Sequence, residues 1–135
     1  MKRFHNIVVG TDFTPSCRVA LKEAFHRAAA DGAAITVVHS MDEFLVHELT
    51  RALSTTKDKI REDWAAKLRT FVTESDIGGP FTVEVRMGNA VAELMEVCKE
   101  KKADLLVMGA KGSGNAPHRI GAVASKCIRS APVDV

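Results

Sequence analysis

The sequence predicts an α/β protein: a three-layer sandwich in which helices cover both faces of a parallel sheet. Short apolar segments rich in β-branched residues alternate with longer segments whose apolar residues recur at helical spacing. Parallel strands require crossover connections, and each right-handed crossover places a helix on one face of the sheet. Because the composition does not shift along the 135 residues, we expect a single domain over residues 1–135.

The first half of the chain predicts two strands, each followed by a helical region. Residues 7–9 are a short buried strand, and Thr14 and Pro15 are typical of the cap and first position of a helix that ends at Gly32. A second apolar strand, 35–38, precedes a long helical region in which polar residues 54–57 predict a kink or a short loop. Its apolar residues are Leu45, Leu49 and Leu53 before that point, and Ile60, Trp64, Leu68 and Phe71 after it.

The second half predicts two further strands. Residues 75–80 are typical of a turn, and apolar and polar residues then alternate over 81–87, which predicts a strand with one face in water. Asn89 is placed to cap the next helix, and residues 105–108 are apolar throughout. Because strands that are apolar on both faces belong inside a sheet, the alternating strand is expected at an edge, which predicts the order 3-2-1-4.

Composition and charge exclude several classes of function. Nineteen basic and seventeen acidic residues give a net charge of +2, so we expect no nucleic-acid partner. No apolar run approaches the roughly twenty residues that span a bilayer, and no secretory apolar segment is present, so we expect a cytoplasmic protein without a membrane partner. Cys17, Cys98 and Cys127 fall on apolar helix faces and are expected to be reduced core residues.

The strand order predicts a ligand site beyond the carboxyl ends of strands one and four. Two loops would line it: Gly10, Thr11 and Asp12 in the first, and residues 109–114 in the second. Glycines let backbone N–H groups approach a phosphate, whereas the Asp12 carboxylate can accept hydrogen bonds from ribose hydroxyls or an exocyclic amine. The alternative is structural, because tight turns need glycine, and Asp12 can serve in a turn or cap. The glycine spacing matches neither common phosphate-binding motif.

At residues 7–14, 37–42, 86–89 and above all 104–112, the sequence resembles the universal stress protein family, and the match runs along nearly the whole chain. The resemblance implies a Rossmann-like fold of the adenine nucleotide alpha hydrolase type, with strand order 3-2-1-4-5. It also implies a protein of stress response or signalling, often a homodimer. One branch of the family binds ATP through the pattern G-x2-G-x9-G-[ST]. Another branch lacks the pattern and does not bind ATP.

Carried over to this sequence, the resemblance implies an adenine-nucleotide site for ATP or AMP, with Mg²⁺ as a companion ion. Asp12 matches the position that contacts the nucleoside, and Ser40 matches one that contacts the base through its backbone. The nucleotide-binding residues implied in this way are Gly10, Thr11, Asp12, Ser40, Met108, Gly109, Gly112, Ser113, Gly121, Ala122 and Val123.

The second half of the phosphate pattern departs from the family. Eight residues separate Gly112 from Gly121 where the pattern has nine, and Ala122 replaces the usual Ser or Thr. Only residues 133–135 remain of the fifth strand, which commonly pairs across the family's dimer interface. The alternative function is therefore a protein–protein interaction module of the branch that binds no nucleotide.

No residue is predicted to be catalytic, so at most slow ATP hydrolysis is expected. No nucleophile occupies a recognisable elbow, no carboxylate pair indicates hydrolysis, and the histidines lack metal-binding spacing. His39, at a strand end within an apolar run, is interpreted as a hydrogen-bonded core residue, and Trp64 as a packing residue.

Overall fold

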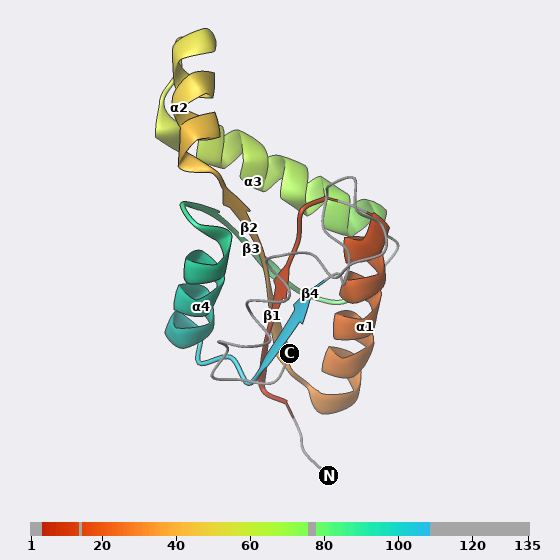
Figure 1. Ribbon diagram of the computed structural model, residues 1–135. Coiled ribbons are helices and arrows are strands. Elements are labelled where there is room, and N and C mark those ends of the chain that lie inside the picture. Colours follow the sequence, from red (N-terminus) through yellow and green to blue (C-terminus); the bar gives the residue numbers. More distant parts are fainter. Residues whose placement is uncertain (1–3, 14, 76–77, 109–135) are drawn as a thin grey trace.

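The computed structural model describes residues 4–13, 15–75 and 78–108, which form four strands and four helices (Figure 1). Strands alternate with helices along the chain, except that two helices follow the second strand. The elements are β1 (Asn6–Gly10), α1 (Pro15–Asp31), β2 (Ala34–Met41), α2 (Glu43–Ala52), α3 (Lys57–Glu74), β3 (Thr82–Met87), α4 (Ala90–Glu100) and β4 (Leu105–Met108).

The sheet has the order β3-β2-β1-β4, and every pair of neighbouring strands is parallel. Val9 at the centre of the sheet pairs with Val37 on one side and Val107 on the other. The predicted strand order and the edge position of the alternating third strand are therefore confirmed. β2 continues to Met41, beyond its predicted end, because the polar residues His39 and Ser40 pair with β3. A fifth strand would lie outside the described residues.

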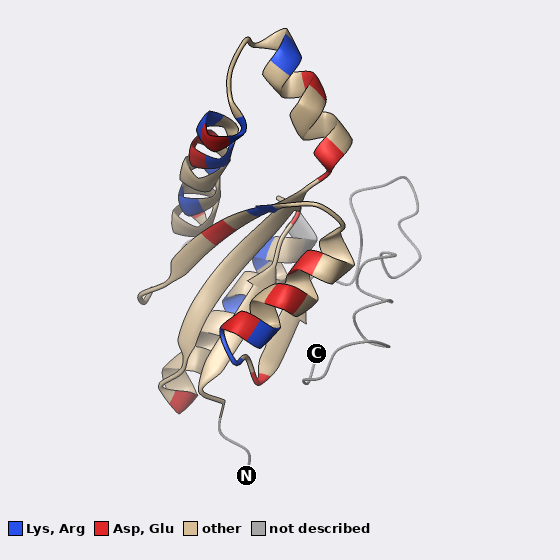
Figure 2. Cartoon of the chain, turned by 90° about the vertical axis from the view of Figure 1, so that its left-hand side faces the viewer, with Lys and Arg blue, Asp and Glu red and all other residues tan. Residues whose placement is uncertain are grey.

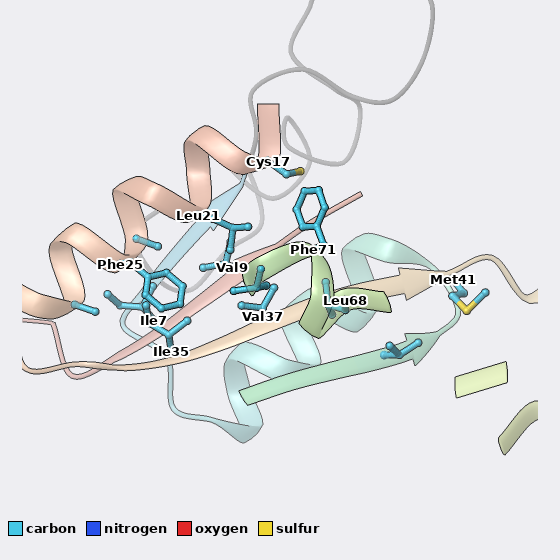
Figure 3. Packing of buried hydrophobic residues seen from close by; sticks show 14 of the residues in the cluster. Ile7, Val9, Cys17, Leu21, Phe25, Ile35, Val37, Met41, Leu68 and Phe71 are labelled. Atoms are coloured by element: carbon cyan, nitrogen blue, oxygen red, sulfur yellow. The ribbon is translucent and has the colours of Figure 1, made fainter. Parts of the chain in front are cut away.

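Residues of β1 alternate between two hydrophobic layers. Ile7 and Val9 face one layer and Val8 faces the other, and all three side chains are buried. The larger layer lies between the sheet and helices α1 and α3 (Figure 3). Leu94, Val97 and Cys98 of α4 fill the opposite layer. The predicted three-layer sandwich is confirmed, because helices cover both faces of the sheet (Figure 1).

The helix ends follow the signals in the sequence. Asn89 caps α4 by accepting a hydrogen bond from the backbone N–H of Ala92 at 3.0 Å. Gly32, with φ +71°, ends α1 in the left-handed conformation that glycine adopts without steric cost. The predicted break in the long helical region lies between α2 and α3, and Thr56 caps α3 through the N–H of Lys59.

Helix α2 packs differently from its apolar pattern. It extends past the end of the sheet (Figure 1), and only Val46 is buried, whereas Leu45 and Leu53 are exposed. The leucine spacing suggested a core face, but a helix placed beyond the sheet has little apolar surface to cover. α2 therefore contributes to the core through Val46 and through Leu49, which is partly buried against the core.

The polar face of the edge strand β3 is only partly open to water: Thr82 is exposed, as its alternation predicted, but Glu84 and Arg86 are half-buried. Arg86 lies 3.2 Å from Glu84, 3.0 Å from Glu93 and 3.1 Å from Glu100, and its side chain is only 22% exposed. Glu93 and Glu100 belong to α4, so these ion pairs join the edge strand to that helix. Elsewhere, charges of both signs alternate along the outer surface of α3, whereas α4 is mainly acidic, with Lys99 in its last turn (Figure 2).

Within the described part of the chain, no helix combines the length and the apolar character needed to cross a membrane.

A matched pair of leucine truncations tests this packing. Leu68 is fully buried between α3 and the sheet, and Leu53 is 66% exposed. Leu68→Ala is expected to lower the free energy of unfolding by about 2–5 kcal/mol, because it leaves a cavity, and Leu53→Ala by less than about 0.5 kcal/mol. Urea unfolding measures both. Equal losses in the two variants would contradict the described core.

Candidate functional site

The parallel register brings the ends of three strands to one edge of the sheet. Gly10, the last residue of β1, pairs with Val38 of β2 and with Met108 of β4. The chain therefore leaves β1 beside the exit of β4, while Ser40 lies further along the neighbouring strand β2. β1 leads through α1 to β2 on one side, whereas β4, which follows α4, lies on the other side of β1, and α1 and α4 cover opposite faces of the sheet. The strand order therefore reverses between β1 and β4, where the sequence predicted a switch point.

Gly10 has a packing reason for lacking a side chain. A Cβ atom at this position would lie 3.2 Å from Cδ2 of Leu94 in α4, closer than side chains normally approach. Leu94 is itself buried in the layer beneath α4. The glycine therefore lets the helix approach the sheet at the point where β1 ends.

Thr11 continues the sheet by one residue and begins the loop. Its backbone N–H donates to the carbonyl of Val38 at 2.9 Å, and its hydroxyl oxygen accepts the N–H of Phe13 at 3.1 Å. The residue is buried. The first bond ties Thr11 to the neighbouring strand β2 and the second is local to the loop, so Thr11 fixes the direction in which the loop leaves β1.

Asp12 interacts with the first turn of α1. The Cys17 thiol donates to Asp12 Oδ1 at 3.0 Å, and the Asp12 backbone N–H donates to the Cys17 sulfur at 3.3 Å. The carboxylate thus takes part in the loop-to-helix connection, as the structural alternative anticipated. Cys17 and Cys98 are buried, as predicted, and Cys127 lies outside the described residues.

Phe13 and three residues from other elements form an aromatic cluster. The ring of Phe13 lies 4.8 Å from His39, 5.7 Å from Trp64 and 5.3 Å from Phe71, each in an edge-on arrangement. Phe13 has φ +68°, a conformation that a bulky L residue adopts at a cost of about 1–2 kcal/mol. Favourable aromatic contacts of this kind compensate such strain. Sequence reasoning missed Phe13, because only the fold brings these rings together.

His39 joins this cluster to the loop. Its Nδ1 lies 2.8 Å from the carbonyl oxygen of Thr11, and its ring stacks on Trp64 with an interplanar angle of 21°. A carbonyl can only accept a hydrogen bond, so Nδ1 carries a proton and donates. The interpretations of His39 as a hydrogen-bonded residue and of Trp64 as a packing residue are both confirmed.

Burial lowers the pKa of His39 below its ordinary value of 6.5. The bond to the Thr11 carbonyl and the nearby Asp12 carboxylate favour the charged form but do not outweigh the loss of hydration. His39 is therefore more readily neutral in the folded protein than in the unfolded chain.

The remaining predicted site residues divide between two groups. The hydroxyl of Ser40 donates to the carbonyl of Gly88 at 3.2 Å, so its side chain serves the turn after β3. Met108 is half-buried and packs against the layer under α4. Gly109, Gly112, Ser113, Gly121, Ala122 and Val123 lie outside the described residues. Among the residues that are described, no three His, Cys, Asp or Glu side chains are grouped to hold a metal ion.

A parallel sheet of this order, covered on both faces and with its loops gathered at the carboxyl ends of the strands, defines the doubly wound, Rossmann-like class of α/β proteins. Within that class the chain belongs to the universal stress protein family, whose family model matches residues 3–135.

Individual relatives agree with this assignment. A universal stress protein of Mycobacterium tuberculosis is 31% identical in an alignment of 143 positions, which covers all of this chain and 96% of the relative. The structure of a universal stress protein from Lactobacillus plantarum is 25% identical with a TM-score of 0.75, covering 100% of this chain and 97% of that chain.

Two structures of the same fold were solved with bound nucleotides. A universal stress protein in complex with cAMP is 23% identical with a TM-score of 0.72, covering 99% of this chain and 96% of that chain. The Archaeoglobus fulgidus universal stress protein in complex with dAMP is 20% identical with a TM-score of 0.64, covering 99% of this chain and 97% of that chain.

The lowered pKa of His39 predicts a pH dependence of stability. Well above pH 6.5, His39 is neutral in both the folded protein and the unfolded chain. As the pH falls through 6.5, the unfolded chain binds a proton before the folded protein does. The free energy of unfolding therefore decreases until the pH has fallen below the lowered pKa of the folded protein. The free energy of unfolding, measured with urea between about pH 7.5 and 5.5, should therefore fall more steeply for the unchanged protein than for His39→Asn, whose side chain does not titrate. The exposed His47 provides the control, His47→Asn. An identical pH dependence in all three proteins would contradict the assignment.

Proposed function

We propose that this universal stress protein binds an adenine nucleotide, ATP or AMP, at the carboxyl ends of β1 and β4, and acts in stress response or signalling. The observation that carries the proposal is the placement of Asp12. It lies directly beyond the strand that pairs with β4, in a loop segment where Thr11, Asp12 and Phe13 each donate a backbone hydrogen bond. A fixed carboxylate at a switch point suits a ligand with hydroxyl or amine donors.

The chemistry of the two loops suits the two ends of a nucleotide. In the proposed arrangement, Asp12 accepts hydrogen bonds from the ribose or the adenine amine, and the backbone of Ser40 contacts the base. The glycines at 109, 112 and 121, which follow β4 in the sequence, supply N–H groups to phosphate. Family membership supports this orientation, with the nucleoside toward Asp12 and the phosphates toward the glycines. The cAMP and dAMP complexes are of proteins with the same fold.

The altered phosphate loop sets the expected preference between nucleotides. Ala122 cannot donate the hydroxyl hydrogen bond of the usual Ser or Thr, a contact worth about 1 kcal/mol or somewhat more to a charged acceptor. Affinity for ATP is therefore expected to be about tenfold lower than a complete pattern would give. Nucleoside contacts at Asp12 then carry a larger share of the binding, and Mg²⁺ would enter only with the phosphates of ATP.

A second candidate function is an interaction module that binds no nucleotide. The favouring observation is that the Asp12 carboxylate already accepts the Cys17 thiol, which gives this residue a structural role without any ligand. The shortened loop between Gly112 and Gly121 agrees with this alternative. A cytoplasmic location and a homodimer belong to the proposal in either form.

Replacing Asp12 tests the leading proposal. Asp12→Ala is expected to weaken AMP and ATP binding about tenfold or more, because the ligand donors lose a charged acceptor. Isothermal titration of the purified protein, with native mass spectrometry for co-purified nucleotide, provides the measurement. Asp58→Ala is the control, since the Asp58 side chain is 91% exposed on α3.

Binding equal to that of the unchanged protein in Asp12→Ala would remove Asp12 from the site. Absence of any co-purified nucleotide, together with no binding at millimolar AMP or ATP, would favour the interaction module instead.

A further inference from the structure

The segment Thr11–Asp12–Phe13 has a conformation that its own sequence does not favour. Phe13 has φ +68°, which for a bulky side chain is strained, and no glycine follows it to relieve the turn. A strained loop keeps its conformation only where contacts with neighbouring residues stabilise it. These contacts therefore decide where the Asp12 carboxylate lies relative to the sheet edge.

Most of these contacts are local to the chain. Thr11 Oγ1 accepts the N–H of Phe13, and Cys17 pairs with Asp12 from the first turn of α1. Such contacts fix the shape of the loop, but residues so close in sequence can move together. Fixing the loop relative to the sheet edge requires bonds to a different strand, and the backbone N–H of Thr11 supplies one by donating to the carbonyl of Val38 in β2 at 2.9 Å.

His39 supplies a side-chain bond of that kind. It belongs to β2, an inner strand of the sheet, and its Nδ1–H donates to the carbonyl of Thr11 at 2.8 Å. The ring is held by the edge of Phe13 and by the parallel face of Trp64. Its backbone pairs with Val85 of β3 and directly precedes Ser40. The imidazole thus connects the loop that carries Asp12 to the strand that carries Ser40.

From this geometry we infer that His39 is a positioning residue for nucleotide binding: its bond to the Thr11 carbonyl sets the distance between Asp12 and the backbone of Ser40. The inference rests on the proposed function, because these two residues are the proposed contacts for the nucleoside. His39 itself needs no contact with the ligand. It acts through Thr11, by preventing the strained loop from relaxing away from the sheet.

Two substitutions separate the hydrogen bond from the ring. The amide nitrogen of asparagine occupies the same bonded position as Nδ1, so His39→Asn retains a donor toward Thr11 and loses the aromatic ring. His39→Phe retains a ring against Trp64 and loses the donor. Removing the donor is expected to weaken AMP binding about tenfold in His39→Phe, whereas His39→Asn should stay within about threefold of the unchanged protein.

Isothermal titration with AMP, well below the unfolding midpoint of each variant, measures the affinities. His47→Phe on the exposed surface of α2 is the control and should bind as the unchanged protein does. Amide hydrogen exchange supplies a second readout: exchange at Asp12 and Phe13 should accelerate in His39→Phe and stay slow in His39→Asn. A residue that only stabilises the fold would shift the unfolding midpoint without this split.

Several results would overturn the inference. Undiminished binding in His39→Phe, or equal losses in both variants, would show that the donor does not position the loop, while the proposed function would stand. No AMP binding by the unchanged protein would overturn the proposed function and this inference with it. Long-range ¹H–¹⁵N spectra of the unchanged protein test it without any variant, because a neutral His39 protonated on Nε2 would lack the required donor.

Discussion

The arrangement of this protein depends on the burial of β1 between two hydrophobic layers. Its alternate side chains, Val9 and Val8, lie in different layers, and its backbone pairs with β2 and β4. A strand buried on both faces and paired along both edges has no freedom to slide, since a shift of one residue would exchange its two faces. The end of β1 is therefore fixed, and so is the start of the loop that carries Asp12.

Beyond the end of β1, the loop obtains its shape from packing contacts and hydrogen bonds within the protein, without a ligand. Gly10 admits Leu94, Cys17 bonds to Asp12, and Phe13 fits among the rings of His39, Trp64 and Phe71. The structural and the nucleotide-binding interpretations of Asp12 are therefore compatible. A carboxylate that is already placed by its own loop needs little reorganisation to accept a ligand, and preorganisation of this kind favours affinity.

The sequence predicted the sheet well because burial on both faces leaves a direct trace in composition. Residues 7–9 and 105–108 are apolar throughout, residues 35–38 are apolar except for Thr36, and the alternation over 81–87 placed β3 correctly at the edge. The sequence was a poorer guide to the burial of a side chain where that burial depends on which element packs against the helix or strand. Leu45 and Leu53 looked like core residues, and Arg86 looked like a surface residue, because a periodic pattern does not say which element lies opposite.

For the candidate site, the sequence could indicate Gly10, Thr11 and Asp12 because the chain changes there from a strand to a helix. It could not reveal that His39 and Phe13, twenty-six positions apart in the numbering, meet over Trp64. The hydrogen bond from His39 to the Thr11 carbonyl depends on the parallel register of β1 and β2, which places the end of one strand beside the middle of the other. A side chain on one strand can therefore control the loop of its neighbour, and a site at a switch point is shaped as much by the adjacent strand as by the loops that touch the ligand.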